Sequence, residues 1–165
     1  MPKSTMNTTL NYSPNFDVKK RKVKELKFII FHYTGMKKEN QAITRLTDTK
    51  SKVSSHYLIK NNGEILTLVP DLYIAWHAGV SSWKNYKSIN KYSIGIEISN
   101  PGHEYFYKKF SKKQIKSILK LSTYLRKKYK IKSNFILGHS DIAPDRKKDP
   151  GEKFPWKYLS KNKIG

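Results

Sequence analysis

Two histidines stand where long apolar runs end, a place from which side chains can reach a shared site. His32 comes near the end of LKFIIFHY, and His139 ends NFILGH. If these two runs are neighbouring strands, both imidazoles emerge at one edge of the sheet. A catalytic zinc site commonly uses three protein ligands and leaves a fourth position for water, so two histidines and one carboxylate would suffice. Each histidine alone is also typical of a hydrogen-bonded core residue, but their matched positions favour a metal site.

The loop that follows His139, GHSDIAPDRKKDPG, is too polar for a core element. It offers three carboxylates for the third ligand position: Asp141, Asp145 and Asp149. Asp149 precedes a Pro-Gly pair, and a residue before proline is biased toward extended backbone, which would fix the direction of its side chain. Asp141 and Asp145 could instead stabilise local turns. Spacing alone favours Asp149 only modestly, so all three remain candidates.

A carboxylate inside an apolar strand is the second unusual feature. Glu97 lies in YSIGIEI, residues 92–98, where its burial is costly unless it is paired or catalytic. Gly95 shares its face and leaves room beside it. A solvated strand face, or an ion pair with one of the many lysines, would explain Glu97 equally well. Lys147, two residues before Asp149, could bring an ammonium group near a metal, although taken singly it is typical of a solvated lysine.

The surrounding pattern predicts the elements that position these residues. Strands are expected at residues 26–33, 54–60, 64–69, 92–98 and 134–139, and helices at 39–48 and 111–129. The longer helix has a capping box of Ser111 and Gln114. Its expected apolar stripe consists of Ile115, Ile118, Leu119, Ser122, Leu125 and Tyr129. This mixture predicts an α/β fold, a single domain with a mixed central β-sheet flanked by helices.

The N-terminal segment and the overall composition indicate the domain organisation and limit the possible kinds of site and partner. Residues 1–25 are polar with a Lys/Arg run, so we expect a loosely ordered basic arm followed by one domain at 26–165. The absence of cysteine excludes disulfides, thiolate nucleophiles and cysteine-based zinc sites. The net charge of +22 would attract polyanions such as nucleic acid or an anionic wall polymer, although AT-rich codon usage also produces such lysine-rich chains.

Several motifs, in order and with similar spacing, resemble the landmarks of one enzyme family. They are FIIFHYT, SSHYLI, AWHAG, SIGIEI and GHSDIAPDRKKDPG followed by FPW. Together they resemble the zinc-dependent N-acetylmuramoyl-L-alanine amidases of the AmpD/AmiD group, which share a fold with peptidoglycan recognition proteins. The resemblance covers roughly residues 26–160. The last motif is the most specific, whereas AWHAG is weak by itself.

The resemblance implies a role for each candidate residue. It implies that His32, His139 and Asp149 bind Zn²⁺, which resolves the choice among the loop aspartates. It also implies that Glu97 is the catalytic carboxylate and Lys147 its cationic partner. The implied fold is the amidase domain at residues 26–165, and the implied reaction is hydrolysis of the amide between N-acetylmuramic acid and L-alanine in peptidoglycan or muropeptides, in cell-wall turnover or recycling.

Substrate contacts are less well defined. Tyr33, Trp76 and His77 are candidates, together with Trp83 and Trp156, since aromatic faces pack on sugar rings; Trp76 and Trp156 are also typical of packed structural residues. Tyr33 and the threonine after it match the broad-specificity AmiD branch, whereas the AmpD branch commonly has asparagine there. The resemblance therefore does not imply a restriction to anhydro-muropeptides.

The sequence also bears on the cellular location and the binding partners. No stretch approaches the roughly 18 apolar residues of a membrane span, and the N-terminus lacks the apolar segment of a secretory signal. A cytoplasmic location is therefore expected, with the periplasm allowed by family analogy, and the oligomeric state is left open. Two alternatives are a non-catalytic peptidoglycan-binding module and a basic nucleic-acid-binding protein. Nucleic acid is not the expected partner, because the sequence lacks an RNP-like aromatic strand, a zinc finger and a recognisable helix-turn-helix.

Overall fold

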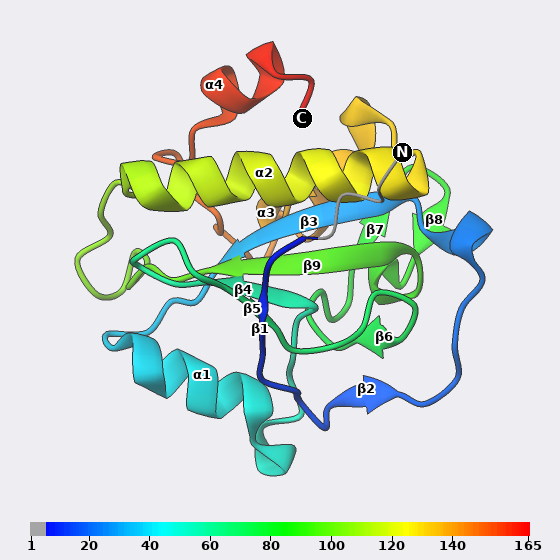
Figure 1. The fold of residues 1–165 in the computed structure, drawn as a ribbon, viewed down its shortest axis with the longest axis horizontal. Coiled ribbons are helices and arrows are strands. Elements are labelled where there is room, and N and C mark those ends of the chain that lie inside the picture. The colour runs from blue at the N-terminus through cyan, green and yellow to red at the C-terminus, as the bar shows by residue number, and fades with distance from the viewer. Residues whose placement is uncertain (1–5) are drawn as a thin grey trace.

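A six-stranded mixed sheet forms the centre of the molecule (Figure 1). The structure, a computed structural model, describes residues 6–165. In spatial order the strands are β1 (Thr9–Leu10), β5 (Ile65–Thr67), β4 (Tyr57–Ile59), β9 (Ser93–Ile98), β3 (Phe28–Tyr33) and β10 (Ile136–Gly138). Only the β4–β5 pair is antiparallel among these six. The predicted α/β fold with a mixed central sheet is confirmed.

Helices and two small sheets surround the central sheet. The α-helices are α1 (Glu39–Thr47), α2 (Lys112–Tyr129), α3 (His139–Ile142) and α4 (Trp156–Lys161), and short 3₁₀ turns occupy Val23–Glu25, Thr49–Ser51, Ile89–Tyr92 and Ser133–Phe135. Strand β2 (Phe16–Asp17) pairs with β6 (Ile74–Ala75), and β7 (Ser82–Trp83) pairs with β8 (Tyr86–Lys87). Within residues 6–165, no helix combines the length and apolar character that crossing a membrane requires.

Strand β3 is covered on both faces, as its largely apolar sequence predicts. Ile29 and Phe31 belong to the core that contains the buried residues of α2. Phe28 and Ile30 belong to a second cluster on the opposite face, which includes Ala78. Because side chains alternate along a strand, His32 follows Phe28 and Ile30 and points away from α2. The candidate site therefore lies on the sheet face that α2 does not cover.

The predicted helix at residues 111–129 is confirmed as α2. Ser111 Oγ accepts a hydrogen bond from the Gln114 main-chain nitrogen (3.1 Å), and Gln114 Oε1 accepts one from the Ser111 nitrogen (3.0 Å), so the capping box forms as expected. The predicted stripe omitted Leu121, which is fully buried. It lies three residues after Ile118 and four before Leu125, which places it on the same helix face.

The predicted loose arm requires correction for residues 6–25. Strand β1 pairs with β5, and β2 pairs with β6. Asn15 is only 3% exposed, and its side-chain nitrogen donates to the carbonyl oxygens of Asp48 and Val53, each at 2.8 Å. The polar residues are held by main-chain partners elsewhere in the fold, which the composition of the segment could not reveal. Residues 1–5 of the predicted arm lie outside the described residues.

A largely buried carboxylate links α2 to the sheet. Asp71 accepts hydrogen bonds from the hydroxyl groups of Tyr57 and Tyr129, both at 2.5 Å, and pairs with the Lys128 ammonium at 2.9 Å. Burial alone would raise the pKa of Asp71, but the hydrogen bonds from Tyr129, Tyr57 and Lys128 outweigh it and hold the pKa below its usual value. The ionised form is therefore the one that stabilises the fold.

Substituting Asp71→Asn is expected to lower the free energy of unfolding at pH 7 by ~1.5–3 kcal/mol, the usual contribution of hydrogen bonds to a charged group. Because the folded-state pKa lies below that of the unfolded chain, this stabilisation is complete above about pH 4 and is lost as the pH falls through the folded-state value. Urea unfolding at pH 7 and pH 3 checks this. The exposed Asp145→Asn variant is the control, and a wild-type-to-D71N difference that did not shrink at pH 3 would refute the assignment.

Candidate metal centre

The strand order brings the two predicted histidines to one edge of the sheet. Strand β10 pairs in parallel with β3, with Gly138 opposite Phe31, so the residues that follow these positions, His139 and His32, emerge together. On the other side of β3, Glu97 of β9 lies directly opposite His32. Paired residues of neighbouring strands point to the same face. The three side chains therefore share the face that α2 leaves uncovered.

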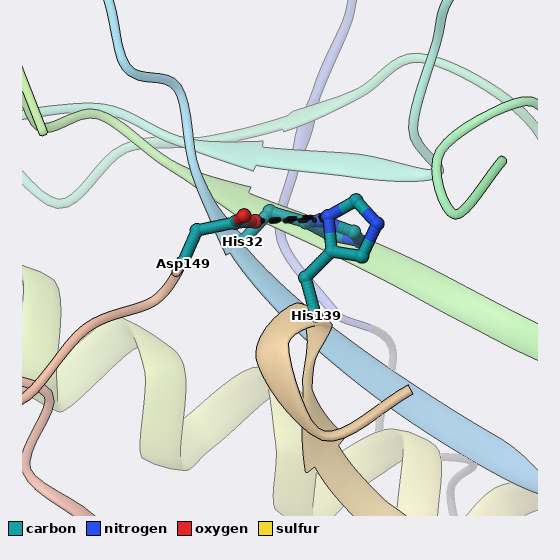
Figure 2. A group of neighbouring side chains, drawn as sticks. All are labelled: His32, His139 and Asp149. Carbon is teal, nitrogen blue, oxygen red and sulfur yellow. Dashed lines mark hydrogen bonds and ion pairs between the residues drawn. The ribbon is translucent and has the colours of Figure 1, made fainter. Parts of the chain in front are cut away.

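The side chains of His32, His139 and Asp149 converge (Figure 2). The two Nδ1 atoms are 2.9 Å apart, and each lies 3.1 Å from Asp149 Oδ2. All three residues are buried. Burial, followed by the neighbouring His139, lowers the pKa of His32 to about 4, which keeps its imidazole neutral near pH 7. A neutral imidazole is the form that ligates a metal.

The three facing atoms of His32, His139 and Asp149 are better suited to binding a cation than to hydrogen bonding with one another. His139 Nε2 lies 3.0 Å from the Ala78 carbonyl oxygen, which can only accept, so Nε2 carries the proton. In the neutral ring the lone pair is then on Nδ1, and it faces Asp149 Oδ2, another acceptor. Two acceptors repel at this distance unless a positive charge lies between them. Two imidazoles and one carboxylate are ordinary ligands for a divalent transition metal.

Glu97 lies beside this cluster with one oxygen unsatisfied. Its Oε2 is buried and has no hydrogen-bond partner within residues 6–165. Burial, followed by repulsion from Asp149, raises the pKa of Glu97 well above its usual value, and the positive charge of Lys147 opposes this rise. The room that Gly95 leaves is filled by the ring of His77. A carboxylate with a strongly raised pKa in a cleft is typical of a catalytic group.

One cleft contains these groups. It measures about 920 Å³, and its lining includes His32, Glu97, His139, Lys147 and Asp149. The Lys147 side chain is half-buried there. Tyr33 and Trp76 line the same cleft, and the Trp76 indole nitrogen donates to Asp17 Oδ1 at 2.8 Å. The cleft is therefore large enough for a ligand that extends well beyond the three clustered side chains.

The competing aspartates take other positions. Asp141 accepts a hydrogen bond from the Gly138 main-chain nitrogen at 2.7 Å and so caps the start of α3. Asp145 is exposed. Asp149 is brought back beside His139 because the Ser140 nitrogen donates to the Asp149 carbonyl oxygen at 2.9 Å. Of the three aspartates, Asp149 is the one that lies beside the two histidines.

The other aromatic candidates separate into different environments. Trp156 packs against Phe31 and Phe154 in the core on the α2 side, away from the cleft. Trp83 packs against the cluster that contains Phe28. His77 lines the cleft but is 9% exposed, and its Nδ1 and Nε2 contact His32 and Ser93. Neither Trp156 nor Trp83 belongs to the lining of the cleft.

Sequence reasoning missed two supporting residues. Asn90 Oδ1 accepts hydrogen bonds from the main-chain nitrogens of His77 (3.2 Å) and Ala78 (2.8 Å). Arg146 donates from Nη2 to the carbonyl oxygens of Ala78 (2.8 Å) and Val80 (2.5 Å). The sequence does not distinguish Arg146 from the many other cationic residues. It also gives no sign of the contacts of Asn90, because its partners lie 12 and 13 positions away along the chain.

Comparisons with known proteins show which family the chain belongs to. A family model described as N-acetylmuramoyl-L-alanine amidase matches residues 21–152. The chain belongs to this family. AmiD of Escherichia coli (strain K12) is 38% identical over 152 residues, which cover 85% of this chain and 54% of AmiD. The 1,6-anhydro-N-acetylmuramyl-L-alanine amidase AmpD of Haemophilus influenzae is 32% identical over 90% of this chain and 88% of its own length.

Solved structures of these amidases share the fold. A complex of E. coli AmiD with anhydro-N-acetylmuramic acid-L-Ala-D-γ-Glu-L-Lys matches with a TM-score of 0.79 at 37% identity, covering 86% of this chain and 58% of that one. A selenomethionine AmpD structure matches with a TM-score of 0.80 at 28% identity, covering 96% and 94%. The chain thus spans about half the length of AmiD, 54%, and most of the length of AmpD, 88%.

Proposed function

We propose that this amidase-family chain is a zinc-dependent enzyme that hydrolyses the amide bond between N-acetylmuramic acid and L-alanine in peptidoglycan or muropeptides, in cell-wall turnover or recycling. The observation that carries the proposal is the convergence of His32 Nδ1, His139 Nδ1 and Asp149 Oδ2 in a cleft that also holds Glu97. The relatives support the substrate class, because AmiD of similar fold was solved with a muramyl peptide described as its substrate.

The ligand types favour zinc among the common metals. Mg²⁺ and Ca²⁺ are bound mainly by oxygen, whereas two imidazoles and one carboxylate are a frequent catalytic zinc set. His32, His139 and Asp149 would hold the ion. When bound, zinc supplies a Lewis acid that polarises the amide carbonyl and lowers the pKa of water. The three protein ligands leave a further position for the reacting groups.

Glu97 is proposed to move the proton. The raised pKa of Glu97 lies closer to the working pH than the pKa of an exposed glutamate does. This suits a group that must both accept and donate a proton. Its carboxylate takes a proton from the attacking water as the water oxygen bonds to the carbonyl carbon. It then gives that proton to the alanine nitrogen as the carbon–nitrogen bond breaks. The products are a lactyl carboxyl group and a free amine.

Lys147 is proposed as the cation that faces the substrate carbonyl oxygen. Its side chain lines the same cleft, and its charge influences both Glu97 and His32. A fixed positive charge at this position stabilises the negative charge that develops on the oxygen during attack. Tyr33 and Trp76, which line the cleft beyond the metal ligands, are proposed to contact the sugar or the peptide.

Product analysis tests this function. We expect incubation with whole sacculi or with anhydro-muropeptides to release free stem peptides that begin with L-alanine, and we expect a chelator to stop this release. Mass spectrometry identifies the new amino and carboxyl ends. Comparison of the two substrates gives the preference between intact wall and released fragments.

Two outcomes would overturn the proposal. Retention of the protein on sacculi without any released peptide would favour the non-catalytic wall-binding module. Full activity after exhaustive removal of metal would refute the zinc-dependent mechanism.

A further inference from the structure

We infer that His77 is a positioning residue that fixes His32 in the tautomer whose Nδ1 is free to bind the metal. The inference rests on the proposed zinc-dependent function and extends it to residues that do not touch the metal. It also gives a role to the AWHAG segment. Two adjacent residues of that segment, His77 and Ala78, contact the outer ring nitrogens of the two metal-binding histidines.

A chain of hydrogen bonds defines where the protons are. It begins at the Ile89 carbonyl oxygen, which can only accept, so the Ser93 hydroxyl donates to it at 2.8 Å. The Ser93 oxygen must then accept from His77 Nε2 at 3.0 Å, which places a proton on that nitrogen. In a neutral His77 ring the lone pair is therefore on Nδ1.

The last link reaches the metal centre. His77 Nδ1 lies 2.9 Å from His32 Nε2 and, having the lone pair, accepts the proton of that nitrogen. His32 then presents an unprotonated Nδ1 toward His139 and Asp149. The alternative, a doubly protonated His77 ring, would bury a cation that has no carboxylate partner among the ion pairs of residues 6–165, which is costly.

The surrounding residues are shaped to hold the His77 ring. A β-carbon at Gly95 would lie 2.4 Å from His77 Cγ and 2.6 Å from its Nδ1, so only glycine lets the ring lie this close to β9. The side chain of Asn90 holds the main-chain nitrogens of both His77 and Ala78. One asparagine therefore positions the acceptor for His32 and the acceptor for His139.

The consequence is a preorganised set of ligands. Without an acceptor at position 77, His32 would favour the tautomer with the proton on Nδ1, where it can donate to Asp149 Oδ2. Metal binding would then have to displace that proton and break that hydrogen bond. Loss of an outer partner of this kind typically lowers metal affinity by about 10- to 100-fold.

The test compares two substitutions at one position. We expect His77→Phe, which keeps a ring of similar size but no acceptor, to bind zinc about 10- to 100-fold more weakly in competition with a chromophoric chelator. We expect His77→Asn, whose side-chain oxygen can replace Nδ1 as the acceptor, to recover most of that affinity. The unfolding midpoint of each metal-free variant shows whether packing alone has changed. Equal zinc affinity in H77F and wild type, or equal weakening in both variants, would overturn the inference.

A measurement on the unaltered protein removes any dependence on folding of the variants. Nitrogen-15 NMR of the imidazole rings distinguishes the two neutral tautomers. We expect both His32 and His77 to carry the proton on Nε2 in the metal-free protein and in the zinc-bound protein. A proton on Nδ1 of either ring would contradict the inference. Since neither zinc affinity nor tautomer depends on turnover, a protein that passes these tests yet releases no peptide would refute the proposed function alone.

Discussion

Glu97→Gln is expected to lower kcat for muropeptide hydrolysis by roughly 100- to 10,000-fold, the usual contribution of a positioned acid–base group. Glutamine keeps the size of the side chain but can neither take a proton from water nor return one to the leaving amine. Because Glu97 lies beside the three clustered side chains and is not one of them, zinc content should remain at one ion per chain. Steady-state kinetics with metal analysis of the same preparation measures both.

A matched control separates this effect from a general loss of negative charge in the cleft. Glu104 is exposed and lines the same cleft, so Glu104→Gln removes an equal charge without removing the proposed proton carrier. We expect its kcat to stay within about threefold of wild type. Turnover of E97Q within about threefold of wild type, with zinc bound, would mean that another group carries the proton.

Replacing a metal ligand should abolish both zinc binding and turnover. For Asp149→Ala we expect kcat/KM to fall by at least about 1,000-fold, equivalent to ~4 kcal/mol of barrier, because metal activation contributes several kcal/mol. Zinc at 100 times its dissociation constant should stabilise the wild-type fold by ~2.7 kcal/mol, and this gain should be absent in the variant. Thermal unfolding with and without zinc measures it.

The same loop supplies the control. Asp145 is exposed and lies four residues from Asp149, so Asp145→Ala removes an aspartate of the same loop without touching the cluster. We expect this variant to retain zinc, the zinc-dependent rise in stability and most of the activity. If D145A lost zinc while D149A retained it, the ligand assignment would be wrong.

The parts of the fold that follow from local patterns were predictable. The largely apolar run at residues 26–33 indicated a strand covered on both faces, and the capping box at Ser111 marked the start of α2. The ends of β3 and β10 pointed to His32 and His139, because a polar residue near or just after the end of a buried strand lies at the sheet edge. These features depend on few distant contacts.

Features that depend on distant contacts were not predictable from the residues alone. Asp149 joins the histidines because a main-chain hydrogen bond to Ser140 folds the loop back, so choosing it over Asp141 required the family resemblance. The order of residues 6–25 depends on pairing with β5 and β6. The contact of His77 with His32 joins residues 45 positions apart, which no spacing rule anticipates.

Anomalous X-ray diffraction from crystals of the zinc-loaded protein, recorded on both sides of the zinc absorption edge, tests the central claim most directly. We expect one strong anomalous peak within about 2.0–2.2 Å of His32 Nδ1, His139 Nδ1 and an Asp149 carboxylate oxygen, with a remaining position open to the cleft. A peak elsewhere on the chain, or coordination of either histidine through Nε2, would contradict the account.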